Sequence, residues 1–377
     1  MASMKENLKK AVSKIAGAST DSATPKFWIS SGNYCINKIM SGNWERAVPQ
    51  GRVTMFSGPS GSGKSFIIGN VIKQALEDGF FVAAIDSENA LDDEYLQAIG
   101  VDTESDNYFY CSVKNMSSGS KTFQSITKGY NAALLNGTLD DLPKILIVVD
   151  SLDFLFVDGM LEEYEKTGEM GSDQGLHAKK MRQLLNLMIS DIKYIPAAVL
   201  VTKQVYVDQT KYASPPWKMS ESIKYAVSQL MLVTRLLDKD VKSKEITGIR
   251  LKVFGWKTRF TKPFQQVEIV VPYDTGLNPY EGILQVAKGL GIVTLSGSWY
   301  VFEGAKFYEK DFPAYQEAIF AKIKEFKNLK IDAISDDVIE EAVPEKKAKA
   351  LAKKKLETLV ASGKMEPGED DADIPPD

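Results

Sequence analysis

From residue 51 onward the chain alternates short apolar runs with stretches that repeat at helical spacing. The runs expected to form strands are RVTMFSG, FFVAAID, YFYCSV, ILIVVD, AAVLVT and QLMLV. Helices are expected between several of them, at residues 65–78, 124–135 and 176–192. Strands that are apolar on both faces and alternate with helices predict an α/β fold, in which helices cover both faces of a mostly parallel sheet. IRLKVFGWKTRF and FQQVEIVV follow without long helices, which predicts antiparallel edge strands.

Residues 1–17 have a different pattern, that of a single amphipathic helix. Leu8, Val12 and Ile15 lie on one stripe, and a Ser/Thr-rich linker follows as far as Pro25. The helix cannot bury this stripe against its own linker, so it should dock on the body of the protein or on another molecule, and we expect another protomer.

Changes of pattern and composition divide the chain into four predicted parts. These are the N-terminal helix and linker (1–28), the α/β core (29–279), a small C-terminal α/β domain (280–335), and a helical basic segment with an acidic, disordered tail (336–377).

Composition excludes several classes of protein. The net charge of −4 gives no overall attraction to nucleic acid, so DNA binding would need a local basic patch. Two cysteines do not make a disulfide framework, and no apolar run is long enough to span a bilayer, so we expect a cytoplasmic protein without a membrane partner. His177 is the only histidine, which argues against a histidine-rich metal site or a Ser-His-Asp triad.

The glycine-rich stretch after the first core strand predicts a phosphate-binding loop. It matches G-x-x-x-x-G-K-[ST] with Gly58, Pro59, Ser60, Gly61, Ser62, Gly63, Lys64 and Ser65. Glycines let backbone N–H groups face phosphate oxygens, and the following helix adds its N-terminal donors. Lys64 would reach the β- and γ-phosphates of ATP, and the Ser65 hydroxyl would ligate Mg²⁺. The strand and helix around the motif make a chance Gly/Ser loop the weaker interpretation.

Acidic residues at two further strand ends complete a candidate ATPase site. Asp150 ends the run ILIVVD and is the expected second Mg²⁺ partner, although an acid here also suits a turn. Glu88 lies just past FFVAAID and is the candidate for polarising a water molecule. For Asp86, a turn or capping role is as good an interpretation as a catalytic one.

These segments together resemble the RecA family of strand-exchange ATPases. GPSGSGKS, IDSENALDDEYLQAIGVD, ILIVVDSLDFL and AAVLVTKQ occur in that family's order, and the resemblance extends over residues 29–311. It implies a RecA-like P-loop core. The loop sequence typical of the bacterial proteins is missing, which suggests a divergent branch, such as the phage recombinases of the UvsX kind.

The resemblance implies roles at the matching positions. Glu88 matches the family's catalytic glutamate. Asp92 and Tyr95 match its adenine-side contacts, with Tyr95 stacking on the base. Gln204 matches the glutamine that senses the γ-phosphate and signals to a DNA-binding loop.

WKTRFTKPF resembles a family segment in which two cations reach ATP bound to the neighbouring protomer. The matching residues are Lys257 and Arg259. Taken without the resemblance, the same residues would be a solvated basic edge strand.

Two loops are implied to contact DNA, at about residues 159–175 and 205–223. In the second, aromatic and basic side chains alternate, as expected for stacking on bases and contacting phosphates: Tyr206, Lys211, Tyr212, Trp217 and Lys218. The first loop is acidic, and Pro215 and Pro216 stiffen the second, so both depart from the bacterial pattern.

The resemblance implies an ATP-dependent recombination and repair protein. It would form helical filaments on single-stranded DNA, pair with double-stranded DNA and hydrolyse ATP in response to DNA, with single-strand-binding and mediator proteins as further candidate partners. A hexameric RecA-fold helicase is one alternative, but it offers no reason for the N-terminal helix and the GSWYVFEG region. The other is a DNA-binding filament that uses ATP only for assembly, against which Glu88 argues.

Overall fold

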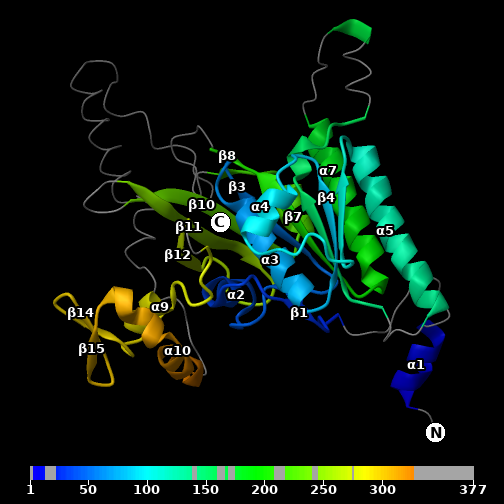
Figure 1. Ribbon diagram of the computed structural model, residues 1–377. Coiled ribbons are helices and arrows are strands. Elements are labelled where there is room, and N and C mark those ends of the chain that lie inside the picture. Colours follow the sequence, from blue (N-terminus) through cyan, green and yellow to red (C-terminus); the bar gives the residue numbers. More distant parts are fainter. Residues whose placement is uncertain are drawn as a thin grey trace, which may run out of the picture.

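The computed structural model has an α/β fold built on one large twisted sheet (Figure 1). It describes residues 3–12, 23–137, 142–158, 166–168, 175–207, 217–239, 245–273 and 276–326.

The large sheet has eight strands in the order β12-β11-β10-β3-β7-β6-β4-β5. Their bounds are β3 Val53–Gly58, β4 Phe81–Asp86, β5 Tyr108–Ser112, β6 Ile145–Asp150, β7 Ala197–Gln204, β10 Gln229–Lys239, β11 Ile246–Thr258 and β12 Gln266–Pro272. The strands from β10 to β5 are parallel, whereas β11 and β12 add antiparallel pairings at one edge. The mostly parallel sheet and its antiparallel edge, both expected from the apolar runs, are confirmed.

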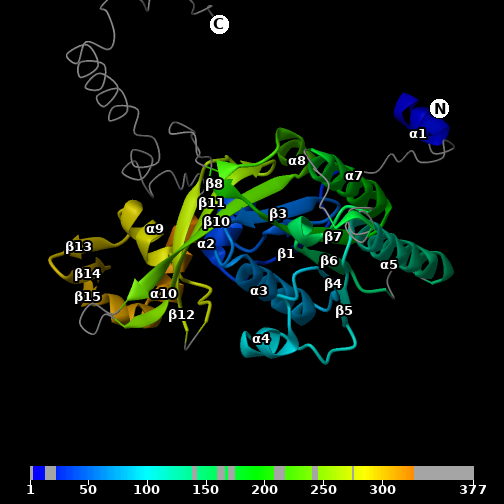
Figure 2. The same cartoon turned by 90° about the horizontal axis from the view of Figure 1, so that it is seen from above.

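Helices cover both faces of this sheet (Figure 2). α3 (Lys64–Glu77) lies on one face, and α5 (Met116–Asn136) and α7 (Leu176–Asp191) lie on the other. Alternate residues of β4 divide between the two layers: Val82 belongs to the core cluster with α3, and Ala83 to the cluster with α5 and α7. Because both faces are buried, the central strands contain apolar residues almost throughout.

Short elements connect these layers. They are β1 Trp28–Ile29, α2 Tyr34–Ser41, β2 Val48–Pro49, α4 Asp93–Ala98, η1 Leu152–Phe154, η2 Ile192–Tyr194, β8 Tyr206–Val207, β9 Trp217–Lys218 and α8 Glu221–Ala226. β1 pairs with β2, and β8 pairs with β9, in both cases antiparallel.

The C-terminal elements pack on α2 and form one continuous core with the α3 face of the sheet. They are α9 Ile283–Gly289, β13 Thr294–Ser296, β14 Trp299–Phe302, β15 Ala305–Phe307, η3 Glu309–Ala314 and α10 Gln316–Glu325. The Phe320 ring stacks on Tyr34 with centroids 4.4 Å apart and meets Trp44 edge-on at 5.4 Å. Lys324 also pairs with Glu45 at 2.9 Å. α10 is therefore anchored to α2 and to the residues just after it, and its pair with Glu45 spans 279 residues of sequence.

The predicted N-terminal helix is present as α1 (Met4–Val12), and none of its residues is buried. Leu8, on the predicted stripe, is 56% exposed, and Ile15 lies outside the described residues. Docking of this helix on another protomer stays a prediction. Within the residues that the structure describes, no helix is both long and apolar enough to cross a membrane.

Candidate functional site

The predicted phosphate-binding loop joins β3 to α3 at the carboxyl edge of the sheet. Gly63, just before α3, has a φ of 92°, which an L side chain rarely adopts. At Gly58 a Cβ atom would lie 2.2 Å from the Val233 carbonyl oxygen of the neighbouring strand β10. Glycine is thus required at both positions.

A cavity of about 550 Å³ opens beside this loop. Seven of the residues predicted for ATP or Mg²⁺ line it together, namely Gly61, Ser62, Gly63, Lys64, Ser65, Glu88 and Tyr95. Arg235 and Tyr273, which the sequence analysis did not single out, line it from β10 and from the chain just after β12. Its volume and mixed lining suit a nucleotide-sized ligand.

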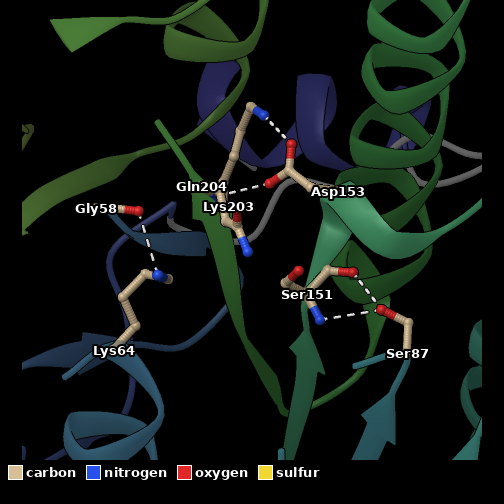
Figure 3. Close-up of polar contacts among 7 residues, drawn as sticks. All are labelled: Gly58, Lys64, Ser87, Ser151, Asp153, Lys203 and Gln204. Carbon is tan, nitrogen blue, oxygen red and sulfur yellow. Dashed lines mark hydrogen bonds and ion pairs between the residues drawn. The ribbon is translucent and has the colours of Figure 1, made fainter. Parts of the chain in front are cut away.

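Lys64 is the buried cation of the site. Its ammonium donates to the carbonyl oxygen of Gly58 at 3.2 Å (Figure 3). It also donates to the carbonyl oxygen of Pro59 at 2.8 Å, so the side chain is folded back along the loop. Burial lowers the pKa of Lys64, and the nearby carboxylates of Glu88 and Asp150 oppose that shift. A phosphate group would meet a cation that is largely removed from water, where its charge acts strongly.

Asp150 ends β6 and faces the first turn of α3. Its carboxylate accepts a hydrogen bond from the Ser65 hydroxyl at 2.9 Å and another from Thr202. Burial raises the pKa of Asp150, and these hydrogen bonds lower it. No cluster of three or more His, Cys, Asp or Glu side chains gathers among the described residues, so phosphate and water oxygens would complete a Mg²⁺ shell here. Ser65 and Asp150 are hard oxygen donors and fit that ion.

Glu88 stands on a loop that Asp86 organises. The buried Asp86 carboxylate accepts the backbone N–H groups of Glu88 at 2.8 Å, Asn89 at 2.8 Å and Leu91 at 3.0 Å. Asp86 therefore has the turn role. Burial, and then the charge of Asp150, raises the pKa of Glu88, which strengthens its carboxylate as a proton acceptor.

The two residues expected at the adenine side differ in their placement. Tyr95 lines the cavity, and burial, aided by the charges of Asp150 and Asp92, raises its pKa to about 12. Asp92 caps α4 by accepting the N–H of Tyr95 at 2.9 Å, and it is not among the lining residues. Its base contact stays a prediction.

Gln204 ends β7 directly beside the start of the phosphate-binding loop. It is the register partner of Gly58 on β3, and the next N–H, of Val205, donates to the Gly58 carbonyl at 3.3 Å. Lys203 and the Gln204 backbone both contact Asp153, on η1 (Figure 3).

Lys257 and Arg259 are not among the residues that line the cavity of their own chain. The Lys257 ammonium donates to the carbonyls of Lys224 at 2.7 Å and Val227 at 2.8 Å, at the C-terminal end of α8. Burial, and then the charge of Arg259, lowers the pKa of Lys257. Arg259 lies just beyond β11 and is exposed. Their action on a neighbouring protomer stays a prediction.

The predicted DNA loops fall largely outside the described residues. Lys211 and Tyr212 lie there, as does most of 159–175. The backbones of Tyr206, Trp217 and Lys218 belong to the antiparallel β8–β9 pair, in which Tyr206 is opposite Lys218. This pair places the two ends of the intervening segment side by side at the carboxyl end of β7.

Some polar residues of the site had no distinct sequence signal. Thr202 and Lys203 precede Gln204 within an otherwise apolar run, and Arg235 sits inside a long strand. Asp153 had a weak signal as the second acid of DSLDF, directly after the strand that ends at Asp150.

Comparison with known proteins found one matching family model, RecA N-terminal domain, over residues 5–278. Among curated proteins, Protein RecA of Chloroherpeton thalassium is 28% identical, covering 77% of this chain and 79% of its own length. Protein RecA of Thermus aquaticus is also 28% identical, over 74% of this chain and 80% of its own. Protein RecA of Clostridioides difficile is 27% identical, over 78% and 84%.

Proposed function

Because the chain belongs to the RecA family, we propose that it is a recombination and repair protein that assembles on single-stranded DNA and hydrolyses ATP in response to it. Members of this family are DNA-dependent ATPases that use ATP with Mg²⁺. The finer activity proposed for this chain is homologous pairing with duplex DNA and strand exchange within a helical filament.

One observation carries the proposal, the adjacency of the phosphate-binding loop and the end of β7. Gly58 and Gln204 are register partners, and the chain after Gln204 enters the β8–β9 pair within two residues. Gln204, the residue proposed to sense the γ-phosphate, is therefore covalently continuous with the predicted DNA loop. ATP used only to hold a filament together would not need a water-activating base, the role proposed for Glu88 in the lining of the cavity.

The residues of the site divide the chemistry between them. Lys64 and the N-terminal N–H groups of α3 would bind the phosphates, and Ser65 and Asp150 would hold Mg²⁺, which neutralises phosphate charge. Glu88, with its raised pKa, would accept the proton of the attacking water. Tyr95 would stack on the base.

Electron microscopy of the full chain with single-stranded DNA and a non-hydrolysable ATP analogue tests the proposal. We expect open helical filaments that depend on the nucleotide. Closed rings would favour a helicase instead, and an absence of any assembly on DNA would contradict the proposal.

A second experiment tests completion of the ATP site across protomers. Protomers with Glu88→Gln are mixed with protomers with Arg259→Ala, and DNA-stimulated turnover is measured at several ratios. In an equal mixture, random head-to-tail assembly pairs an intact Glu88 with an intact Arg259 at about one interface in four. We therefore expect activity near that fraction of wild type, well above the sum of the two separate variants. No recovery at any ratio, with co-assembly demonstrated, would rule out a trans role for Arg259.

A further inference from the structure

The end of β7 is held at two points by one carboxylate, that of Asp153. One oxygen pairs with the Lys203 ammonium, and the other accepts the backbone N–H of Gln204 at 2.5 Å (Figure 3). The Asp153 side chain is 13% exposed and that of Lys203 is 11% exposed. Because both bonds involve charged groups shielded from water, they are among the stronger hydrogen bonds available to a protein.

Asp153 belongs to a short run of chain that contacts the other groups of the nucleotide site. Three residues earlier, Asp150 accepts the hydroxyl of Ser65. The Ser151 carbonyl accepts the hydroxyl of Ser87 at 2.6 Å, next to Glu88. Residues 150–153 thus contact Ser65, the proposed Mg²⁺ ligand, the loop that carries Glu88, and the end of β7.

The contact between Asp153 and Gln204 is made with the Gln204 backbone. The N–H that Asp153 holds belongs to Gln204 itself, so it fixes the backbone from which that side chain extends. Two residues later the chain is in β8, whose partner β9 closes the predicted DNA loop. A displacement of 150–153 would therefore act on Gln204 and on the root of the loop together.

We propose that Asp153 is a positioning residue that couples the nucleotide site to the DNA loop by holding the backbone of Gln204, an inference that rests on the proposed function. Neither Asp153 nor Gln204 is among the residues that line the cavity, and the hydrogen bonds of Asp153 go to Lys203 and the Gln204 backbone, so we infer that it acts by positioning the end of β7. A purely structural ion pair would alter stability and leave the response to DNA intact.

The test uses two full-length double variants and compares ATP turnover with and without saturating single-stranded DNA. Asp153→Ala/Lys203→Met removes the ion pair and the acceptor for the Gln204 N–H. Asp153→Asn/Lys203→Met also removes the ion pair but keeps one acceptor oxygen. Neither leaves a lone buried charge, which would by itself destabilise the fold. Glu45→Ala, which breaks the exposed pair with Lys324, is the control for losing a carboxylate elsewhere.

We expect the alanine variant to bind a fluorescent ATP analogue with unchanged affinity and to lose about tenfold in stimulation by DNA, a typical size for coupling between sites. The asparagine variant should keep the stimulation of wild type. Wild-type stimulation in the alanine variant, or equal loss in both variants, would overturn the proposal.

Folding is checked by thermal melting. If the alanine variant is unfolded, Asp153→Glu decides, because it keeps the charge beside Lys203 but its extra methylene prevents the two-point contact. Retained stimulation in that variant would also overturn the proposal. Failure of the proposed function looks different, since the wild-type protein itself would then show no stimulation by DNA.

Discussion

Replacing Lys64 by alanine will abolish measurable ATP turnover and weaken nucleotide binding. Lys64 is the cation that the structure places in the phosphate-binding loop, with its ammonium 2.8 Å from the Pro59 carbonyl oxygen and within the influence of Glu88 and Asp150. Without it, phosphate charge would face these carboxylates uncompensated. Loss of one positioned donor to a developing charge typically costs about 10²- to 10³-fold in rate, and a buried cation at the phosphates should cost at least as much.

Steady-state turnover and titration with a fluorescent nucleotide measure the two effects. Lys121→Ala, which removes an exposed lysine of α5, is the matched control and should behave as wild type. Turnover in Lys64→Ala within a few-fold of this control would exclude the loop 58–65 as the catalytic phosphate site.

Replacing Glu88 by glutamine should separate binding from hydrolysis. Glutamine has nearly the same shape and still lines the cavity, so nucleotide affinity should be kept. It cannot accept the proton of the attacking water, and loss of a positioned general base typically costs about 10²- to 10⁴-fold in rate. Glu94→Gln, at an exposed position of α4, is the control. Near-normal turnover in Glu88→Gln would remove Glu88 from the catalytic role.

The pH profile gives an independent check on Glu88. Its pKa is raised, first by burial and then by the charge of Asp150. Only the deprotonated carboxylate accepts a proton, so wild-type turnover should fall as the pH drops through this raised pKa, at a higher pH than for an ordinary glutamate. That acid limb should be missing from the residual activity of Glu88→Gln. If the residual activity of Glu88→Gln falls at the same pH as that of wild type, the fall is caused by another titrating group.

Strand positions could be predicted from the sequence because both faces of the central sheet are buried, which leaves continuous apolar runs. The ends of α3 and α7 were predicted to within one residue, but the start of α5 was not. We expected a helix at 124–135, whereas α5 begins at Met116. Its first turns are polar, and they are fixed by a capping box in which Asn115 and Ser118 exchange side-chain and backbone hydrogen bonds. Between the buried Met116 and Phe123 this start has only small or polar residues, so its apolar period is weak.

The candidate site could be predicted where its residues are contiguous or end a strand, as with Lys64, Ser65, Glu88 and Asp150. Contacts that depend on the order of the strands in the sheet could not be predicted from the sequence. Asp153 meets Lys203 because β6 and β7 are neighbours in the sheet, and local periodicity does not specify that order. Arg235 and Tyr273 reach the cavity from distant parts of the chain for the same reason.

The packing of α10 on α2 has a consequence for synthesis of the chain on the ribosome. Tyr34 and Trp44 are made before the strands of the large sheet, but the ring that covers them, Phe320, is made after all of those strands. Until then the nascent chain exposes an aromatic surface that its own residues cannot cover, and contacts of such long sequence separation form slowly. Synthesis of α10, rather than emergence of the nucleotide site, should therefore mark the point at which this part of the core closes.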